Sequence, residues 1–486
     1  MQLYNTKTRQ LQEFIPITDK QVLLYTCGPT VYSSPQIGNW VSFLRWDILV
    51  RTLQAQGYTV TRVMNITDVG HLVSDADDGE DKMQKGARID GTTAWQVAKK
   101  YTAEFLDGMH QLNCIMPTYI TKATDFIPEQ IALVQVLEQK GYTYVIDDGV
   151  YYDTSKFATY ADFARLDLEN IKEGARVQVN NQKRNPTDFA LWKFSPKGEQ
   201  RDMEWQSPWG VGFPGWHLEC SAMALAKLGK TIDIHTGGID HIQVHHTDEI
   251  AQSEAANEAP FANYWLHNNH MQVEGTKLSK SLGNSYTLQD IVKKGFTLQD
   301  FRLFVLQSQY RSENNFSWEN LQAAHNRLQN WRHHAALAHQ VIQPDEFIGI
   351  ENLPDSPKQF EELETNHAAT KRSKQAVAAF TAAMQHDMDT PAALTAVDDL
   401  LNAIDEYGMI SFLLQPLTTM LQHVRDYLGL DVFVDDISTD QKELIAQRAA
   451  ARDNKDWAAS DKLRDELLQQ GIELKDTKCG QVWQRT

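Results

Sequence analysis

A short stretch rich in lysine, serine and glycine is the clearest chemical signal in this 486-residue chain. It runs from Gly275 to Asn284 and contains Lys277, Ser279, Lys280 and Ser281. Glycine lets a ligand approach the backbone, serine hydroxyls donate hydrogen bonds, and each lysine ammonium is a compact charge for a phosphate. The stretch predicts a polyphosphate-binding loop, and a lysine-rich surface turn is the alternative interpretation.

Four side chains of metal-ligand type give a second signal. His245 and Glu249 are four residues apart, a spacing that places both on one face of a helix. Cys27 follows an apolar run, and Cys220 offers a second sulfur. Two thiolates, an imidazole and a carboxylate suit tetrahedral zinc. By spacing alone, a solvated helix face and small buried cysteines explain the same residues.

An alternation of strand and helix patterns positions these side chains. The apolar run Val22–Thr26 ends in a glycine turn, helical spacing follows from Ile37 to Leu49, and Thr59–Ile66 is predicted as a second strand. This order opens a parallel α/β sheet, whose ligands bind beyond the carboxyl ends of the strands. The turn from Cys27 to Asn39 is therefore expected at a ligand site.

The α/β pattern is interrupted and then resumes with a strand around Thr231–His235, so the sheet is expected to be split in sequence and continuous in space. The predicted fold is α/β, with a Rossmann-like parallel-sheet domain split by an insertion, then an α-helical bundle and a small C-terminal α+β module. The expected divisions are 1–112 and 205–285 for the halves of the sheet domain, 113–204 for the insertion, 286–317 for connecting helices, 318–435 for the bundle and 436–486 for the last module.

Composition limits the classes of function. The formal charge is -18, which argues against a generally sticky nucleic-acid binder, but residues 440–486 contain nine basic and nine acidic residues. The chain has no apolar run of 18 residues and no signal pattern at its start, so a cytoplasmic protein is expected. Cys27, Cys114, Cys220 and Cys479 lack the spacing of a disulfide framework.

The neutral tail offers candidate contacts for a polyanion. Arg448, Arg452 and Lys455 are spaced to align on one helical face, and Trp483 is an aromatic ring that stacks on an unpaired RNA base in this interpretation. A salt-bridged solvated helix and a tryptophan in the core of the tail are the alternatives.

Five ordered blocks of the chain resemble the cysteine–tRNA ligases, a family of class I aminoacyl-tRNA synthetases. The resemblance extends from about Leu3 to Arg485 and includes the tail. The blocks are Tyr25–Tyr32, Asn65–Asp68, Pro214–Met223, Ile239–Asp240 together with His245–Ser253, and Lys277–Asn284.

The resemblance implies a two-step reaction. Cysteine and ATP, with Mg²⁺, give cysteinyl-adenylate and pyrophosphate, and the cysteinyl group then passes to the 3′ end of tRNA(Cys). By position, Cys27, Cys220, His245 and Glu249 match the family's ligands for one zinc ion, which takes the substrate thiolate as a further ligand. Zinc favours a thiol over the similarly shaped serine hydroxyl, which shape alone would reject poorly.

Other roles also follow from the resemblance. Thr67 and Trp216 match the amino-acid pocket, Asp240 the counter-charge of the substrate ammonium, and Lys280 the lysine that contacts phosphate, with Lys277 either assisting or solvated. The alternative for Thr67 and Asp240 is a turn or helix cap, and the alternative for Trp216 is a core aromatic residue. The remaining substrate or ATP contacts expected by position are Gly28, Thr30, Gly38, Ser279 and Ser281. The resemblance further implies that the insertion is the connective peptide, that 286–317 contact the tRNA stem, and that 436–486 bind the anticodon.

One signature departs from the family. Where the family reads His-Ile-Gly-His, this chain has Gln36-Ile37-Gly38-Asn39, so both imidazoles are missing. The two amides still donate hydrogen bonds but cannot become cationic. Loss of a charge-assisted donor costs ~1.5 to 3 kcal/mol, equivalent to about a tenfold to hundredfold lower rate if nothing replaces it. A working but slower adenylation step is expected.

Two other functions compete with tRNA charging. One is a ligase that joins cysteine to a small aminosugar by the same adenylation chemistry, which would not need the tail from Asp440 to Thr486. The other is a catalytically weakened, tRNA-binding paralogue, for which Gln36 is the support. The leading expectation is a monomeric, cytoplasmic enzyme that acts on cysteine, ATP and tRNA(Cys) and contacts no membrane.

Overall fold

The computed structural model describes two compact units, Met1–Leu298 with Tyr310–Phe316 (unit 1) and Gln299–Gln309 with Ser317–Thr486 (unit 2). Each unit is described by itself. The described residues are all of 1–486 except 71–80, 168–180, 197, 199–200, 278–284, 341–356, 408–410, 478–479 and 486. Side chains are also left undescribed at 277, 357–366, 411–412, 477 and 480.

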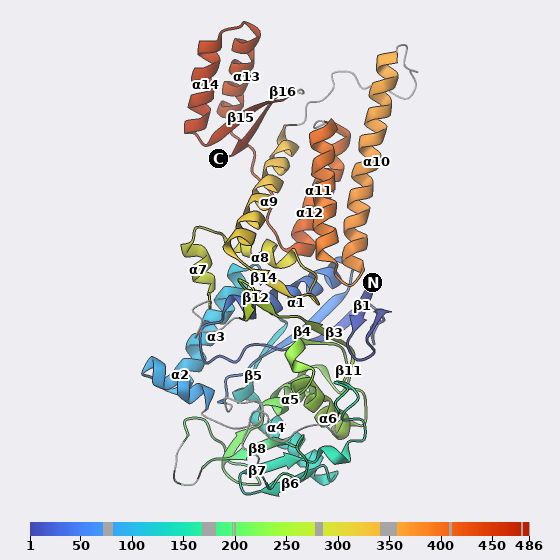
Figure 1. Ribbon diagram of the computed structural model, residues 1–486, viewed down its shortest axis with the longest axis vertical. Coiled ribbons are helices and arrows are strands. Elements are labelled where there is room, and N and C mark those ends of the chain that lie inside the picture. The colour runs from blue at the N-terminus through green and yellow to red at the C-terminus, as the bar shows by residue number, and fades with distance from the viewer. Residues whose placement is uncertain are drawn as a thin grey trace. The chain divides into compact units, whose positions relative to one another are not determined.

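Unit 1 is built on a five-stranded sheet in the order β11-β10-β3-β4-β5, and every neighbouring pair is parallel (Figure 1). The strands are β3 (Gln21–Thr26), β4 (Thr59–Ile66), β5 (Tyr119–Lys122), β10 (Ile232–Gly238) and β11 (Ala262–Asn268). From β3 the chain proceeds outward to β4, whereas β10 lies on the other side of β3. This reversal of strand order is where open α/β sheets bind their ligands.

Helices pack on the parallel sheet, and two of them, α5 and α6, carry predicted metal ligands. A core cluster joins the sheet, through Tyr25, Val63 and Trp265, to α5 and α6, through Met223 and Ile250. The helices of unit 1 are α1 (Ile37–Ala55), α2 (Lys82–Asp90), α3 (Ala94–Gln111), η1 (Ala123–Phe126), α4 (Ile127–Gln139), η2 (Thr154–Lys156), α5 (Trp216–Leu228), η3 (Ile239–His241), α6 (His245–Asn257) and α7 (Leu288–Lys293). Short strands complete it: β1 (Gln2–Asn5), β2 (Gln10–Glu13), β12 (Met271–Val273), β13 (Thr276–Lys277) and β14 (Asn314–Phe316).

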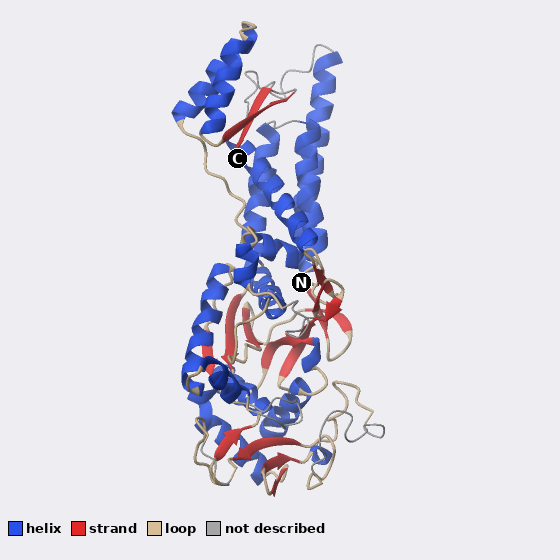
Figure 2. Ribbon diagram, turned by 60° about the vertical axis from the view of Figure 1, so that its left-hand side comes forward, coloured by secondary structure: helices blue, strands red, loops and turns tan. Residues whose placement is uncertain are grey.

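The insertion forms its own antiparallel sheet in the order β6-β7-β8-β9, separate from the parallel strands in Figure 2. Its strands are β6 (Thr143–Ile146), β7 (Gly149–Tyr152), β8 (Phe189–Phe194) and β9 (Gly212–Pro214). One core cluster joins Tyr160 and Trp192 of the insertion to Leu218 of α5 and Ala251 of α6. The insertion therefore packs directly on the two helices that carry the predicted metal ligands.

The structure differs from the expected limits of the insertion at both ends. β5 lies inside residues 113–204 but pairs with β4 as part of the parallel sheet. β9 lies beyond residue 204 but pairs with β8. β5 has only one buried residue among four, so its sequence lacks the apolar run that marks β3.

Unit 2 contains the helical bundle and a small C-terminal module. The helices are α8 (Leu298–Leu306), α9 (Trp318–Ala336), η5 (Leu337–His339), α10 (Pro357–Gln385), α11 (Thr390–Tyr407), α12 (Ser411–Leu428), α13 (Thr439–Asp453) and α14 (Trp457–Gln469). The chain then forms an antiparallel hairpin of β15 (Ile472–Thr477) and β16 (Gly480–Arg485). None of the helices in the described part of the chain has an apolar stretch that would cross a bilayer.

The predicted fold class is confirmed. The parallel α/β sheet is split by an insertion, and helices and a small α+β module follow it.

Candidate active site

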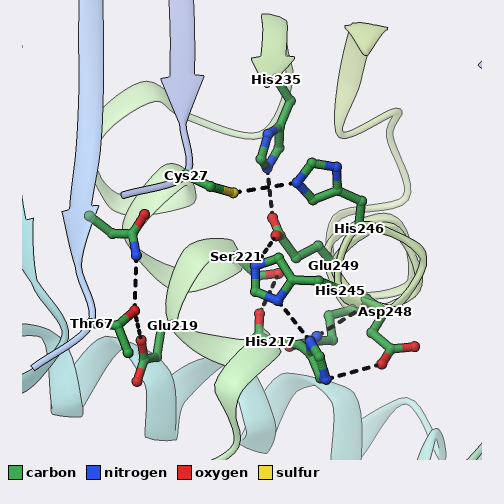
Figure 3. A network of polar contacts seen from close by, with 12 residues as sticks. Cys27, Thr67, His217, Glu219, Ser221, His235, His245, His246, Asp248 and Glu249 are labelled. Atoms are coloured by element: carbon green, nitrogen blue, oxygen red, sulfur yellow. Dashed lines mark hydrogen bonds and ion pairs between the residues drawn. The ribbon is translucent and has the colours of Figure 1, made fainter. Parts of the chain in front are cut away.

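The candidate active site lies at the carboxyl ends of β3 and β10, where the strand order reverses. Cys27 directly follows β3, and its backbone N–H donates to the Thr236 carbonyl oxygen of β10 at 3.2 Å. Cys220 lies near the start of α5 and His245 begins α6, and both belong to one group of potential metal ligands with Cys27; Figure 3 shows Cys27 and His245. Next to Cys27, a side chain at Gly28 would place its Cβ 1.7 Å from the Asn65 carbonyl oxygen, so this close approach requires glycine.

The four predicted metal ligands converge. The ligand atoms of Cys27, Cys220, His245 and Glu249 all lie within 4.8 Å of one another. His245 Nε2 lies 2.9 Å from Glu249 Oε1, as the four-residue spacing on α6 requires. Glu249 is fully buried, and its Oε1 has no properly aligned hydrogen bond within the described part of the chain. A buried carboxylate oxygen needs a partner, and a metal ion ligated by the other three residues satisfies that need.

A second set of potential ligands overlaps the first. Cys27 and Glu249 also form a group with His235 and His246. His235 Nε2 lies 2.8 Å from Glu249 Oε2, and His246 Nε2 lies 3.4 Å from the Cys27 sulfur (Figure 3). Sequence reasoning missed both histidines. His246 directly follows a predicted ligand and His235 ends a predicted strand, but only the folded chain shows that they face the shared residues.

The charges of this buried cluster are strongly coupled. Burial tends to raise the pKa of Glu249, but the imidazoles of His235 and His245 outweigh burial and lower it to about 2. Burial tends to lower the pKa of His245, and Glu249 and Cys220 reverse that effect, so the pKa of His245 is raised. A hydrogen bond with Cys27 lowers the pKa of Cys220, while burial raises that of Cys27. The cluster therefore favours an ionised carboxylate at Glu249, and it shifts Cys220 towards the thiolate, the form in which cysteine binds zinc.

The residues expected in the amino-acid pocket surround this cluster. The Trp216 ring lies 4.5 Å from the His245 ring, measured between centroids. Thr67 is buried, and its hydroxyl donates to Glu219 Oε2 at 2.9 Å while it accepts from Asn65 Nδ2 at 3.0 Å. The Thr67 hydroxyl is thus engaged within the protein, next to the helix that carries Cys220.

The exposed acid of the predicted pocket follows β10. Asp240 lies on η3 and is exposed. Burial is the largest cause of the raised pKa of Cys27, Cys220 and Glu249 follow, and the charge of Asp240 raises it further. It is therefore close enough to the cluster to act on a group bound beside it, and it is accessible to solvent.

The altered signature forms the start of α1. The Gln36 backbone N–H donates to Asn39 Oδ1 at 2.9 Å, so Asn39 caps the helix and its amide nitrogen is left for another partner. Gly38 lies in the same first turn. Gln36 lines an open cavity of about 620 Å³, together with Tyr32, Ser34, Lys85 and Ser285. Thr30 forms a parallel bridge with Thr67 at the entrance to this segment.

The lysine-serine loop is described only at its start. Thr276 and Lys277 form β13, which pairs with β12, and the side chain of Lys277 is outside the described residues. Ser279, Lys280 and Ser281 also lie outside the described residues. Ser285 and Thr287, which follow the loop, line the same cavity as Gln36.

The predicted ridge of cations in the tail does not form. Arg448 is 2% exposed, and its guanidinium binds Asp476 at 3.0 Å. The helix α13 ends at Asp453, so Lys455 lies in the following turn, with a positive φ of 61°. Trp483 is 5% exposed and packs in the module's core with Ile437, Leu467, Ile472 and Leu474.

One exposed aromatic residue of the tail was missed by sequence reasoning. Trp457 is 57% exposed at the start of α14, and the Arg452 guanidinium lies 5.7 Å from its ring centroid. The signal available in the sequence was a tryptophan next to a capping aspartate, Asp456, which fixes it in the first turn of a helix.

Comparison with known proteins gives first the class and then the family. The model of the class I (C) tRNA synthetase catalytic domain matches residues 13–326, and the model of the cysteinyl-tRNA ligase anticodon-binding domain matches residues 434–483. The fold resembles a Mycobacterium tuberculosis methionyl-tRNA synthetase in complex with methionyl-adenylate, with a TM-score of 0.58, 14% identity and coverage of 85% of this chain and 91% of the other. It also resembles a LeuRS–tRNA–LeuAMS ternary complex from Agrobacterium radiobacter, with a TM-score of 0.59, 13% identity and coverage of 86% and 85%. The fold is thus that of the class I aminoacyl-tRNA synthetases.

Full-length relatives narrow the class. The chain is 41% identical to cysteine–tRNA ligase 1 of Burkholderia lata, over 99% of this chain and 96% of the relative. It is 39% identical to the cysteine–tRNA ligase of Treponema denticola, over 100% and 99%. The chain belongs to the cysteine–tRNA ligase family.

Proposed function

We propose that this chain activates cysteine with ATP and transfers the cysteinyl group to the 3′ end of tRNA(Cys). The observation that carries this proposal is the convergence of Cys27, Cys220, His245 and Glu249 at the ligand-binding edge of a class I synthetase fold. The direct test is cysteine-dependent exchange between ATP and pyrophosphate by the purified chain. Absence of exchange with cysteine, or equal exchange with other amino acids, would contradict the proposal.

The four converging residues would hold one zinc ion. When bound, zinc supplies a Lewis-acidic site that accepts a thiolate in preference to a hydroxyl. The protein's part is to hold two sulfurs, one imidazole and one carboxylate in a buried cluster from which water is largely excluded. Trp216 closes one side of the cluster by stacking near His245, and Asp240 is the candidate partner of the substrate ammonium.

The nucleotide is proposed to occupy the cavity beside the altered signature. Gln36, which precedes Gly38 and Asn39 at the start of α1, lines this cavity together with Ser285 and Thr287, which follow the lysine-serine loop in sequence. Lys280, with Lys277, Ser279 and Ser281, is proposed to hold the phosphates of an ATP–Mg²⁺ complex. Gly28 and Thr30 would lie beneath the substrate because they connect β3 to this segment.

Gln36→His is expected to raise the rate of cysteine-dependent pyrophosphate exchange by about tenfold, because an imidazolium restores a charge-assisted hydrogen bond to the phosphates. The measurement is exchange at saturating cysteine over a range of ATP concentrations. Asn39→His is a poorer test, since Asn39 also accepts the Gln36 backbone N–H. A large fall in exchange for Gln36→His would show that glutamine belongs to a repacked site and would refute a simple deficit.

The C-terminal module is proposed to contact the tRNA through its exposed residues. Arg452 and Lys455 remain candidates, while Arg448 and Trp483 face the interior of the module. Trp457 is added because an exposed aromatic ring beside an arginine is a stacking platform for an unpaired base.

Trp457→Ala is expected to raise the KM for tRNA by about 5-fold to 100-fold, since stacking on one base contributes ~1–3 kcal/mol. The measurement is aminoacylation at varied tRNA concentration, with pyrophosphate exchange as the internal control, which is expected to stay unchanged. Phe433→Ala is the matched variant. Phe433 is 41% exposed and has the Arg425 guanidinium 5.3 Å from its ring centroid. Equal effects of the two variants would refute a specific role for Trp457.

The two competing functions have less support. A cysteine:aminosugar ligase has no use for an anticodon-binding module, and that family model matches residues 434–483. A weakened paralogue would not require the four metal ligands to converge. We further propose that the chain acts in the cytoplasm as a monomer, which sedimentation of the purified chain would test.

A further inference from the structure

A line of buried polar contacts runs from the metal cluster through His217 to Asp248 (Figure 3), and from there to Tyr160 of the insertion. His245 Nδ1 lies 2.9 Å from His217 Nδ1, and His217 Nε2 lies 3.4 Å from Asp248 Oδ2. The Tyr160 hydroxyl donates to the other carboxylate oxygen, Asp248 Oδ1, at 2.5 Å. These four side chains are between 1% and 6% exposed. They constitute the polar relay discussed below.

The order of donors and acceptors in the relay follows from its far end. A carboxylate only accepts hydrogen bonds, so His217 Nε2 must carry the proton that faces Asp248. A neutral imidazole has one N–H, and His217 Nδ1 is therefore an acceptor. The contact between the two Nδ1 atoms needs one proton, which His245 must supply. Once His245 is neutral, as a histidine metal ligand must be, its Nε2 atom has a free lone pair, and this atom lies beside Glu249 in the metal cluster.

Packing also fixes the rings of the relay. Phe189 and His217 form an edge-to-face pair, with ring centroids 5.8 Å apart and an interplanar angle of 85°. Trp216 packs against both imidazoles, 5.2 Å from His217 and 4.5 Å from His245. Burial, followed by the charge of Asp248, raises the pKa of Tyr160 well above its usual value, so the hydroxyl remains a donor.

The end of the relay comes from the insertion. Tyr160 follows η2 and shares a core cluster with Val150, Leu218 and Ala251. Asp248 and His245 lie on α6, and His217 lies on α5. The relay thus connects three elements that are far apart in sequence, and it does so at the base of the proposed metal site.

We propose that Tyr160, Asp248 and His217 are positioning residues that fix the ring orientation and tautomer of His245, so that its unprotonated Nε2 is presented to the metal. This inference rests on the proposed function, since it takes His245 as a metal ligand. Outer partners that hold a ligating histidine affect metal affinity by about 10-fold to 100-fold. The insertion therefore contributes to metal binding although it supplies none of the four ligands.

The test is zinc affinity, measured on the full chain by competition with a chromophoric chelator after removal of metal. Tyr160→Phe removes only the donor to Asp248, and we expect about tenfold weaker binding. Tyr152→Phe is the matched control: Tyr152 is fully buried in the same core cluster and donates to the Ala251 carbonyl oxygen of α6 at 3.0 Å, outside the relay. We expect its zinc affinity to stay within about twofold of the unchanged protein, because no relay contact is lost.

A pair of substitutions at Asp248 tests the acceptor. Asp248→Leu removes both oxygens, and we expect binding weaker by about 100-fold. Asp248→Asn keeps a carbonyl oxygen that accepts the His217 N–H, and we expect it to recover most of the affinity. The visible spectrum of the Co²⁺-loaded variants should change for Tyr160→Phe and Asp248→Leu, because the imidazole ligand is misplaced, and should be unchanged for Tyr152→Phe.

The outcomes separate the relay from the proposed function. If the unchanged chain binds zinc and Tyr160→Phe matches Tyr152→Phe in affinity and in Co²⁺ spectrum, the relay is overturned and the metal site stands. If the unchanged chain binds no zinc, both fail. Thermal unfolding of each metal-free variant identifies one that does not fold, and in that case the Tyr160→Phe and Tyr152→Phe pair decides.

Discussion

Cys220→Ser is expected to weaken zinc binding by more than about 100-fold, because loss of a residue that only supports a metal ligand already lowers metal affinity by up to about that factor. It is also expected to abolish the preference for cysteine over serine. Cys220 is 2% exposed, and its sulfur is one of four ligand atoms within 4.8 Å of one another. Hydroxyl oxygen is a poor substitute because it stays protonated at neutral pH. Zinc content of the purified variant and its cysteine-dependent pyrophosphate exchange are the two measurements.

Cys114→Ser is the matched control for this prediction. Cys114 is also buried, at 7% exposed, and is in no disulfide, and it belongs to no group of potential metal ligands among the described residues. We expect normal zinc content and exchange. If Cys220→Ser retained one zinc per chain and its exchange activity, the assignment of the metal ligands would be wrong.

Lys280→Ala is expected to lower cysteine-dependent pyrophosphate exchange by about 10²-fold to 10³-fold, the range for loss of one positioned donor to a developing negative charge. Because both imidazoles of the other signature are absent, we propose that the lysine loop carries a larger share of the phosphate stabilisation here. Zinc content is expected to be unchanged, which separates this effect from damage to the cluster.

The control for Lys280 is Lys293→Ala. Lys293 is exposed on α7, shortly after the loop. It removes the same charge from the neighbourhood without touching the signature, and exchange should stay within about twofold of the unchanged protein, as for most surface changes. Near-normal exchange by Lys280→Ala would refute the role given to the loop.

The fold was predictable where the sequence carries a strong local pattern. β3 is an apolar run that ends in a glycine turn, β4 is rich in β-branched residues, and α1 has apolar residues at helical spacing, so their positions agree with prediction. β5 and β9 have short, mixed sequences and obtain their strand pairing from the sheets they join.

The candidate site divides in the same way. His245 and Glu249 were found because their spacing is a helical one, and Cys27 because it ends a strand. His217, His235 and Tyr160 could not be found by spacing, because β10, α5 and the insertion meet the cluster only in three dimensions. For Arg448 the spacing was misleading. Cations at helical spacing predict an exposed face, but the Arg448 guanidinium is buried in the module, where it binds Asp476 and Gln481.

We propose that a metal-held thiolate site makes this chain a cysteine-specific tRNA ligase. The most direct measurement is aminoacylation of tRNA(Cys) by the zinc-loaded chain in two reactions, one with cysteine alone and one with cysteine plus serine at about 1,000-fold excess. This excess of serine is larger than the ~10²-fold discrimination available from shape alone. Cysteinyl-tRNA is expected in both reactions, and no seryl-tRNA is expected in the second. Seryl-tRNA in amounts comparable to cysteinyl-tRNA, or no charging of tRNA at all, would contradict it.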